Sequence, residues 1–169
     1  MMVRCIDYLL KEQEETGAWF GRWGTNYIYG TWSVLMAFER IHDDQRIDVA
    51  RRRAAAWLKS VQRQDGSWGE TNDSYEDARL AGRGQEGTSY QTAWALLGLM
   101  AAGEFEAQEV QRGISYLQRT QLDSGLWDDP WYSAPGFPRV FYIRYTGYSA
   151  YFPLWALARY YRHSTEIAG

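Results

Sequence analysis

Apolar residues recur three and four positions apart in several stretches of the chain, which is the period of an amphipathic helix. In residues 47–63 they fall at Ile47, Ala50, Ala54, Trp57, Leu58 and Val61. Asp48 lies near the start, where a negative charge suits the helix dipole, and Gly66 follows the end as a stop signal. Residues 91–102 are apolar on nearly every side, which predicts a buried helix.

Similar patterns predict four more helices, over residues 2–13, 30–42, 107–120 and 147–162. Pro153 is expected in the first turn of the last helix or at a kink. The longest segments between helices, 14–29, 64–88 and 121–146, are expected to be loops rich in Gly and aromatic residues. Loops of that length in a compact domain usually carry function. No change of composition marks a boundary, so residues 1–169 are predicted to form a single domain.

Two sequence patterns alternate along the chain, three copies of each. The first is an aromatic residue and Leu, then Gln, then Gly-x-Trp, and its copies lie 49 and 59 residues apart. Its repeated positions are Gln13, Trp19, Gln62, Trp68, Gln121 and Trp127. The second pattern is a helix with Trp94 and Trp155 at equivalent positions, 61 residues apart. Repeats of this kind indicate one supersecondary unit used several times.

The repeated Gln and Trp have an architectural interpretation. Gly permits a tight turn, the Trp ring can stack over a neighbouring helix end, and the Gln amide can bond to the backbone. A ladder of ligand-binding aromatics is the alternative, but identical residues at equivalent corners fit architecture better. The chain is therefore predicted to be all-α, a partial α/α toroid of about six helices, which is half of a double α-barrel of twelve.

Composition narrows the classes of function. The formal net charge of −3 argues against a non-specific nucleic-acid binder, which needs a basic face. One Cys and two His predict no metal site and no cofactor. No run of 18 apolar residues occurs, and the N-terminus is charged too early for a signal peptide, so a cytoplasmic protein is expected.

Aromatic residues are unusually abundant, at 17% of the chain. Eight of the 21 residues in 131–151 are aromatic. Aromatic faces stabilise a cation in an apolar pocket without acting as nucleophiles, so such a cluster suits carbocation chemistry. A packed loop core is the alternative explanation.

A resemblance to a known family supports the chemical interpretation. Residues 112–127, with Arg-Gly-x-x-Tyr-Leu, then Gln and Gly-x-Trp, look like the QW motif of the squalene-hopene and oxidosqualene cyclases. Segments 20–35, 64–70, 89–104 and 136–162 resemble the C-terminal part of bacterial squalene-hopene cyclases, so the resemblance spans nearly all of 2–162. Ala54 replaces the usual Gly of the motif, and Glu15 replaces the usual Asp or Asn.

The resemblance implies a fold, a reaction and a setting. The family folds as two double α-barrels and sits monotopically in the membrane, so peripheral contact with the inner membrane is expected. An acid in a D-x-D-D motif protonates squalene, and aromatic walls stabilise the cations of the cyclisation. The cavity positions carried over are Trp23, Tyr29, Phe137, Phe141, Tyr142, Tyr145 and Tyr148. Phe137 and Phe141 are implied to face cations, whereas Tyr29, Tyr145 and Tyr148 are implied to position the first ring and the acid.

The chain lacks D-x-D-D, so no catalytic residue is predicted within it. The first hypothesis is a C-terminal cyclase fragment that is inactive alone. A half toroid would expose its inner helices, particularly 91–102, so a homo-oligomer or a complex with the missing half is expected. The second is a module that binds a terpenoid or lipid as an oligomer. A third is a self-contained enzyme that uses Asp73, Glu76 or Asp77 as its acid.

One acidic segment resembles a different class of terpene enzyme only partially. Residues 43–48, Asp-Asp-Gln-Arg-Ile-Asp, are one residue out of step with the aspartate-rich magnesium motif of ionising terpene synthases. They lie at a predicted helix end, where a solvated turn is expected instead.

Overall fold

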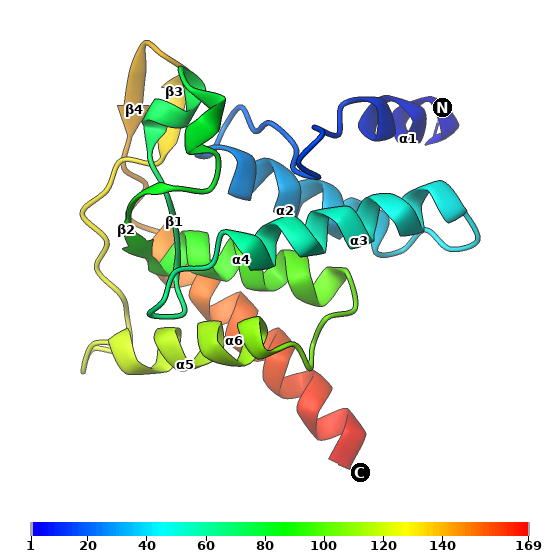
Figure 1. The fold of residues 1–169 in the computed structure, drawn as a ribbon. Helices are drawn as coiled ribbons and strands as arrows, with labels where there is room; N and C mark the ends of the chain where they lie inside the picture. The colour runs from blue at the N-terminus through cyan, green and yellow to red at the C-terminus, as the bar shows by residue number, and fades with distance from the viewer. Residues whose placement is uncertain (1, 169) are drawn as a thin grey trace.

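The computed structural model describes residues 2–168, which form six α-helices and two short antiparallel hairpins (Figure 1). The helices are α1 (Met2–Lys11), α2 (Tyr27–Phe38), α3 (Gln45–Ser60), α4 (Ser89–Ala101), α5 (Gln108–Thr120) and α6 (Tyr148–Ala168). The six helices confirm the predicted all-α fold class. They begin and end within a few residues of the predicted positions, except that α6 extends to residue 168.

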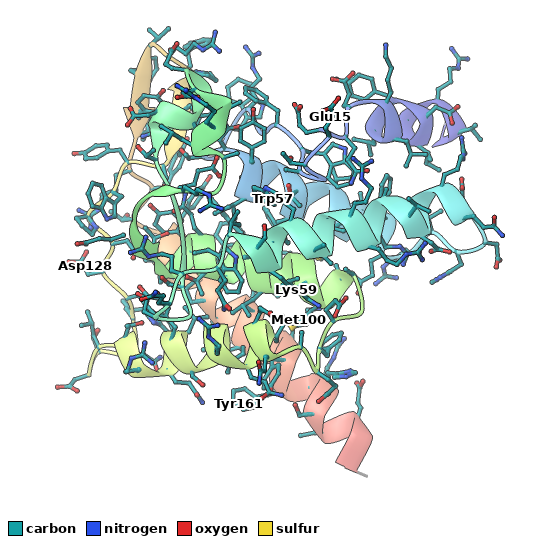
Figure 2. The ribbon with its side chains drawn as sticks, in the orientation of Figure 1. Glu15, Trp57, Lys59, Met100, Asp128 and Tyr161 are labelled. Carbon is teal, nitrogen blue, oxygen red and sulfur yellow. The ribbon has the colours of Figure 1, made fainter. Side chains whose placement is uncertain are left out.

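Inner and outer helices alternate along the chain, as in a partial α/α toroid. The inner row is α2, α4 and α6, with α4 packed against both of the others. The outer helices α3 and α5 each contact α4, and α1 contacts α3. In Figure 1, α4 lies between α3 and α5, with α6 crossing behind. Side chains fill the spaces between the helices, as Trp57 does on α3 with 6% exposure (Figure 2).

The expectation that residues 91–102 would be exposed is wrong. Every residue of α4 from Ser89 to Ala101 is buried, because α2, α5, α6 and the first hairpin surround it. The exposed apolar side chains of the inner row lie instead on α6, where Tyr151 is 69% and Leu154 66% exposed.

Two of the predicted loops contain regular structure. Segment 64–88 holds β1 (Trp68–Glu70), two 3-10 turns, η1 (Asn72–Tyr75) and η2 (Ala78–Leu80), and β2 (Gly84–Thr88). Segment 121–146 holds β3 (Ala134–Phe137) and β4 (Phe141–Ile143). Each hairpin is antiparallel and irregular in register. Their strands are too short to show a period of two along the sequence.

Pro153 lies inside α6, five residues after its first residue, and not in the first turn. Proline lacks the N–H that would donate to the carbonyl of Ser149, so this turn has one helical hydrogen bond fewer.

The repeated Gln and Trp form hydrogen-bonded corners after the outer helices. We define the first, second and third corners as residues 13–19, 62–68 and 121–127. In each corner the Gln Nε2 donates to the carbonyl of the Gly four residues later, at 2.9, 2.9 and 2.8 Å. The indole N–H of each Trp donates to the carbonyl of a Leu ten residues earlier, at 2.7, 2.8 and 2.9 Å. Each corner therefore fastens the chain back onto the helix it has just left.

Candidate functional site

An aromatic cluster joins the three inner helices. It consists of Tyr29, Trp32, Tyr90, Trp94, Tyr145, Tyr148, Phe152 and Trp155. The pairs Tyr29–Trp32, Tyr90–Trp94 and Tyr148–Phe152 are three or four residues apart in one helix, so each pair projects from one helix face. Contacts of α4 with α2 and α6 then bring the three faces together.

Trp94 is the centre of the aromatic cluster. Its ring centroid lies 5.1 Å from that of Tyr29, 5.4 Å from Phe152 and 5.7 Å from Tyr148, with interplanar angles of 72 to 75°. These are edge-to-face contacts, in which the positive edge of one ring meets the negative face of another. Trp94 is fully buried, so its ring faces are already occupied.

The open rings lie at the rim of the cluster. Tyr145 is 50% exposed and Trp155 44% exposed, whereas Tyr29 and Tyr148 are half-buried. A ligand can therefore reach π-faces at this rim without displacing the buried indole. An aromatic face held in a desolvated pocket attracts a cation with roughly 0.5–2 kcal/mol.

Three tyrosines of the cluster, Tyr29, Tyr90 and Tyr148, are neutral at neutral pH. Burial raises the pKa of Tyr29, and it raises the pKa of Tyr90 and of Tyr148 to about 12. A neutral phenol is a weak nucleophile and a weak base. These three phenols therefore offer electron-rich faces to a carbocation, and at neutral pH none of them removes a proton from that carbocation.

The structure divides the predicted cavity residues into separate groups. Tyr29, Tyr145 and Tyr148 belong to the aromatic cluster. Phe137 and Phe141 form their own pair, with ring centroids 5.9 Å apart, in the β3–β4 hairpin. These two rings are 54% and 47% exposed, so their faces are open.

The other two predicted residues lie apart from both groups. The Tyr142 ring stacks on Tyr75, at 6.1 Å between centroids. Trp23 is 53% exposed, and the guanidinium of its neighbour Arg22 lies 5.2 Å from its ring centroid. Within residues 2–168 these seven side chains therefore do not line one enclosed pocket.

Sequence reasoning missed five members of the aromatic cluster. They are Trp32, Tyr90, Trp94, Phe152 and Trp155. Trp94 and Trp155 were noted only as repeat positions of the inner helices. The signal that points to all five is the recurrence of aromatic pairs at helical spacing on three successive inner helices.

Buried carboxylates hold the starts of two inner helices. Glu70 is fully buried, and its oxygens accept from the N–H groups of Asn26, Tyr27 and Ile28 at 3.2, 3.1 and 2.9 Å. Asp129 accepts from the Ser89 N–H at 2.9 Å and from its hydroxyl. Burial raises the pKa of both carboxyl groups, and the N–H donors oppose that rise. Both acids thus cap helices that carry the aromatic cluster.

The acids of the third hypothesis have structural partners. Asp77 begins η2 by accepting from the Arg79 backbone N–H and pairs with its guanidinium, which lowers the pKa of Asp77 to about 2. Asp73 bonds to the Thr71 hydroxyl, and Glu76 lies 3.4 Å from Arg139. An acid that is ionised at neutral pH holds no proton to give to an alkene, which speaks against Asp77 as the initiating acid.

The acidic segment 43–48 is a helix start. Asp44 caps α3 by accepting from the Arg46 N–H at 3.0 Å, and its other oxygen pairs with the Arg46 guanidinium at 2.7 Å. Among the described residues, no group of three or more His, Cys, Asp or Glu is placed to hold a metal ion. The part of the chain that the structure describes also contains no helix long and apolar enough to cross a membrane.

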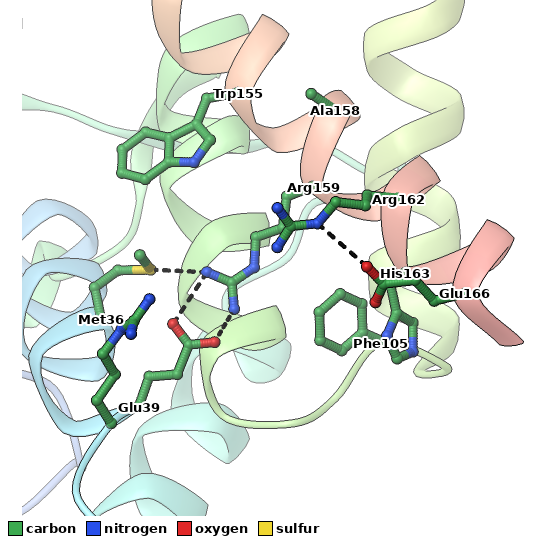
Figure 3. A pocket seen from close by; sticks show the side chains of 10 residues that line it. Met36, Glu39, Phe105, Trp155, Ala158, Arg159, Arg162, His163 and Glu166 are labelled. Carbon is green, nitrogen blue, oxygen red and sulfur yellow. Dashed lines mark hydrogen bonds and ion pairs between the residues drawn. The ribbon is translucent and has the colours of Figure 1, made fainter.

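A hollow between the ends of α2 and α6 is lined by charged and apolar side chains (Figure 3). Arg159 of α6 pairs with Glu39 at the end of α2, and Arg162 pairs with Glu166 one turn further along α6. These arginine and glutamate side chains of the hollow are therefore already paired with one another. His163 stacks on Phe105 with ring centroids 3.7 Å apart. Trp155 of the aromatic cluster also lines this hollow, so the charged residues border one end of the cluster rim.

Comparison with solved structures places the fold among the terpene cyclases. A type II terpene cyclase from Scytonema, in complex with merosterolic acid A, superposes with a TM-score of 0.58 at 18% identity, covering 73% of this chain and 34% of that one. Identity this low shows the shared fold alone. The superposition confirms the class of fold, an α/α toroid of the terpene-cyclase type.

Sequence comparison gives the family. The model of the squalene-hopene cyclase C-terminal domain matches residues 1–162. The squalene-hopene cyclase of Zymomonas mobilis is 56% identical over 162 residues, 94% of this chain and 24% of the relative. That of Bradyrhizobium diazoefficiens is 56% identical over 161 residues, 92% of this chain and 23% of the relative. The chain belongs to the squalene-hopene cyclase family, and it spans about a quarter of the length of these relatives.

Proposed function

We propose that this chain is the C-terminal part of a squalene-hopene-type triterpene cyclase and supplies aromatic walls for the cyclisation of a squalene-like polyene. The aromatic cluster carries the proposal, because it presents neutral π-faces at an apolar rim. In this proposal Tyr145, Tyr148 and Tyr29 face the first ring to form. Phe137 and Phe141 face a later cation through their open rings.

Trp23 and Tyr142 are proposed to line the outer part of the cavity. Both lie outside the two ring groups, so they line the cavity only where the rest of the barrel meets this chain. Peripheral contact with the inner membrane is proposed from the family setting, since an apolar polyene must be drawn from a bilayer.

The chain is proposed to be inactive alone. Protonation of an alkene needs an acid that holds its proton inside an apolar cavity, and the sequence has no D-x-D-D. The buried acids Glu70 and Asp129 face helix N–H groups instead of an open cavity. Incubation of the chain with squalene, followed by gas chromatography of the lipid extract, is expected to return squalene unchanged. A cyclic product from the chain alone would contradict this proposal.

Binding without chemistry is the second candidate function, favoured by the half-exposed rings at the cluster rim. Trp155 is 44% exposed and stacks on Phe152, so its fluorescence reports a ligand at this rim. Titration with squalene in detergent is expected to give a saturable change that Trp155→Phe diminishes. The matched control is Trp23→Phe, which removes an exposed indole outside the cluster. An unsaturable signal in every variant would exclude a binding site at the rim.

A further inference from the structure

The turn between β3 and β4 contains an arginine in an unfavourable backbone conformation. Residues 137–140 form this turn, which the Val140 N–H closes by donating to the Phe137 carbonyl at 3.0 Å. Pro138 occupies the second position of the turn, and Arg139 occupies the third with φ +68°. A proline followed by a residue with positive φ is typical of a type II turn, which favours glycine or asparagine at the third position. An arginine there is strained, because its Cβ crowds the backbone.

The side chain of Arg139 makes a contact that a glycine could not make. Its Nε donates to the carbonyl oxygen of Tyr75 in η1 at 2.8 Å, and its Nη2 donates to the same oxygen. Glu76 Oε1 lies 3.4 Å from this Nε and places a negative charge beside the guanidinium. Hydrogen bonds from a charged donor are stronger than those from a neutral one. A strained residue with a specific side-chain contact points to a function for that side chain.

Tyr75 is itself held firmly. It is 2% exposed, its hydroxyl donates to the Gly24 carbonyl at 3.0 Å, and its ring meets that of Phe20 edge to face at 5.6 Å. The Tyr142 ring of β4 stacks on the Tyr75 ring, and the Tyr142 hydroxyl accepts from the backbone N–H of Arg139 at 3.2 Å. Tyr75 therefore contacts the hairpin both through its carbonyl oxygen and through its ring.

The base of the β3–β4 hairpin is buried, whereas its tip is open. Ala134 at the base is 1% exposed, but Phe137 and Val140 at the tip are 54% and 74% exposed. In Figure 1 the two strands stand beside the turns that connect β1 and β2, which include η1. The contact of Arg139 with Tyr75 therefore joins an exposed tip to a buried part of the molecule.

The turn determines where two open aromatic rings lie. Phe137 and Phe141 are partners across the two strands, with ring centroids 5.9 Å apart and an interplanar angle of 67°. A Cβ added to Gly136 would overlap the Phe141 ring, so this ring lies directly over the Gly136 backbone. Phe137 is the first residue of the turn and Phe141 follows its last, so both rings move when the turn moves. Because a ring attracts a cation only at close range, the position of the turn sets the strength of that attraction.

We propose that Arg139 is a positioning residue, which holds the β3–β4 turn on Tyr75 and thereby fixes Phe137 and Phe141 for a late cation of the cyclisation. This inference rests on the proposed function, because it concerns the two rings that face a later cation there. Arg139 does not touch the substrate and acts through the hairpin. Its guanidinium therefore affects the later rings of the product, and it leaves the start of the reaction unaffected.

Substitutions at Arg139 separate the role of its side chain from that of its backbone conformation. Arg139→Gly removes the guanidinium and leaves a residue suited to positive φ, so the turn can still form. Arg139→Lys keeps a positive charge and a donor, without the planar group that gives two donors to one oxygen. The control is Arg79→Ala, which removes an exposed arginine that pairs with Asp77 in η2.

Hydrogen exchange in the chain itself tests whether Arg139 holds the turn. In Arg139→Gly the amides of β4 are expected to exchange about tenfold faster than in wild type, because a charge-assisted contact is lost. Arg139→Lys is expected to give an intermediate rate and Arg79→Ala the wild-type rate. Circular dichroism establishes that each variant is folded. Equal exchange of β4 in wild type and in folded Arg139→Gly would overturn the proposal.

The products of cyclisation test whether this contact positions the rings. The variants are made in a chimera in which residues 1–162 replace the corresponding part of the Zymomonas mobilis squalene-hopene cyclase. Arg139→Gly is expected to lower the yield of fully cyclised product about tenfold and to raise that of products with fewer rings, since a cation–π contact is weakened. A substitution that only destabilised the fold would lower all products together and keep their ratio.

Two negative results have different meanings in this experiment. An unchanged ratio of products for Arg139→Gly in an active chimera would overturn the positioning role. A wild-type chimera that forms no cyclic product would contradict the proposed function instead, and the exchange rates of β4 would then decide whether Arg139 holds the turn.

Discussion

At the scale of single residues, a few buried polar groups determine where the inner helices begin. Glu70 lies on β1, yet it caps α2, more than forty residues earlier in the chain. Asp129, in the loop after the third corner, caps α4 by accepting a hydrogen bond from the Ser89 N–H. These carboxylates satisfy helix N–H groups that have no intrahelical partner. The aromatic cluster depends on them because four of its eight rings, those of Tyr29, Trp32, Tyr90 and Trp94, project from the helices that they cap.

Replacing Glu70 tests this dependence. Glu70→Ala is expected to lower the free energy of unfolding by about 3 kcal/mol, since it leaves buried N–H groups without an acceptor. Glu70→Gln keeps the shape of the side chain and one acceptor oxygen, so it is expected to lower the free energy of unfolding by less than Glu70→Ala does. Urea denaturation followed by circular dichroism measures both. Glu76→Gln, at an exposed position beside Arg139, is the control. Equal stability of Glu70→Ala and wild type would contradict the capping role.

At the scale of elements, the corner is the unit that builds the toroid. The Trp indole and the Gln amide hold the turn onto the preceding helix. Arg53 and Arg112 then hold the next outer helix onto the turn. The same corner sequence therefore gives different stability according to whether a helix has docked on it.

Two glycines with the same backbone conformation isolate that effect. Gly66 has φ +90° and Gly125 has φ +81°, so Ala at either position costs about 1–2 kcal/mol of backbone strain. Only at Gly66 does the new Cβ also meet the Arg112 backbone. Gly66→Ala is therefore expected to destabilise by about 2 kcal/mol more than Gly125→Ala. Thermal unfolding at low protein concentration measures the difference, and equal losses would show that α5 does not dock closely.

At the scale of the whole molecule, the sequence predicts the helices better than the contacts between them. The ranges of α3, α4 and α5 follow from hydrophobic period and repeat spacing. The start of α2 at Tyr27 does not, because its cap comes from Glu70 on a distant strand. The burial of α4 and the central place of Trp94 arise only when α2 and α6 pack on it. Tyr29, Tyr145 and Tyr148 were placed by family resemblance, and their own spacing would not have assembled them.

The buried phenols predict how stability depends on alkaline pH. Burial raises the pKa of Tyr90, Tyr116 and Tyr148 to about 12, from the usual 10. Below pH 10 both folded and unfolded chains keep these protons. Between about 10 and 12 the unfolded chain loses them while the folded chain retains them, so stability falls as pH rises.

Thermal unfolding across this range measures the effect. Tyr148→Phe is expected to make the decline shallower, and Tyr8→Phe, at a 60% exposed position, is the matched control. Phenolate absorbance should rise with unfolding, and complete ionisation of the tyrosines in a still-folded chain would contradict their burial.

The most direct test of the proposed function is a chimera. Residues 1–162, which match the family model, replace the corresponding C-terminal part of the Zymomonas mobilis squalene-hopene cyclase, a relative 56% identical over 162 residues. If the chain supplies the aromatic walls of the cyclisation cavity, the chimera should convert squalene to cyclic triterpenes within about tenfold of the parental rate. Phe141→Ala in the chimera should then divert or stop the cascade at a late ring. A folded chimera that binds squalene and forms no cyclic product would contradict the account.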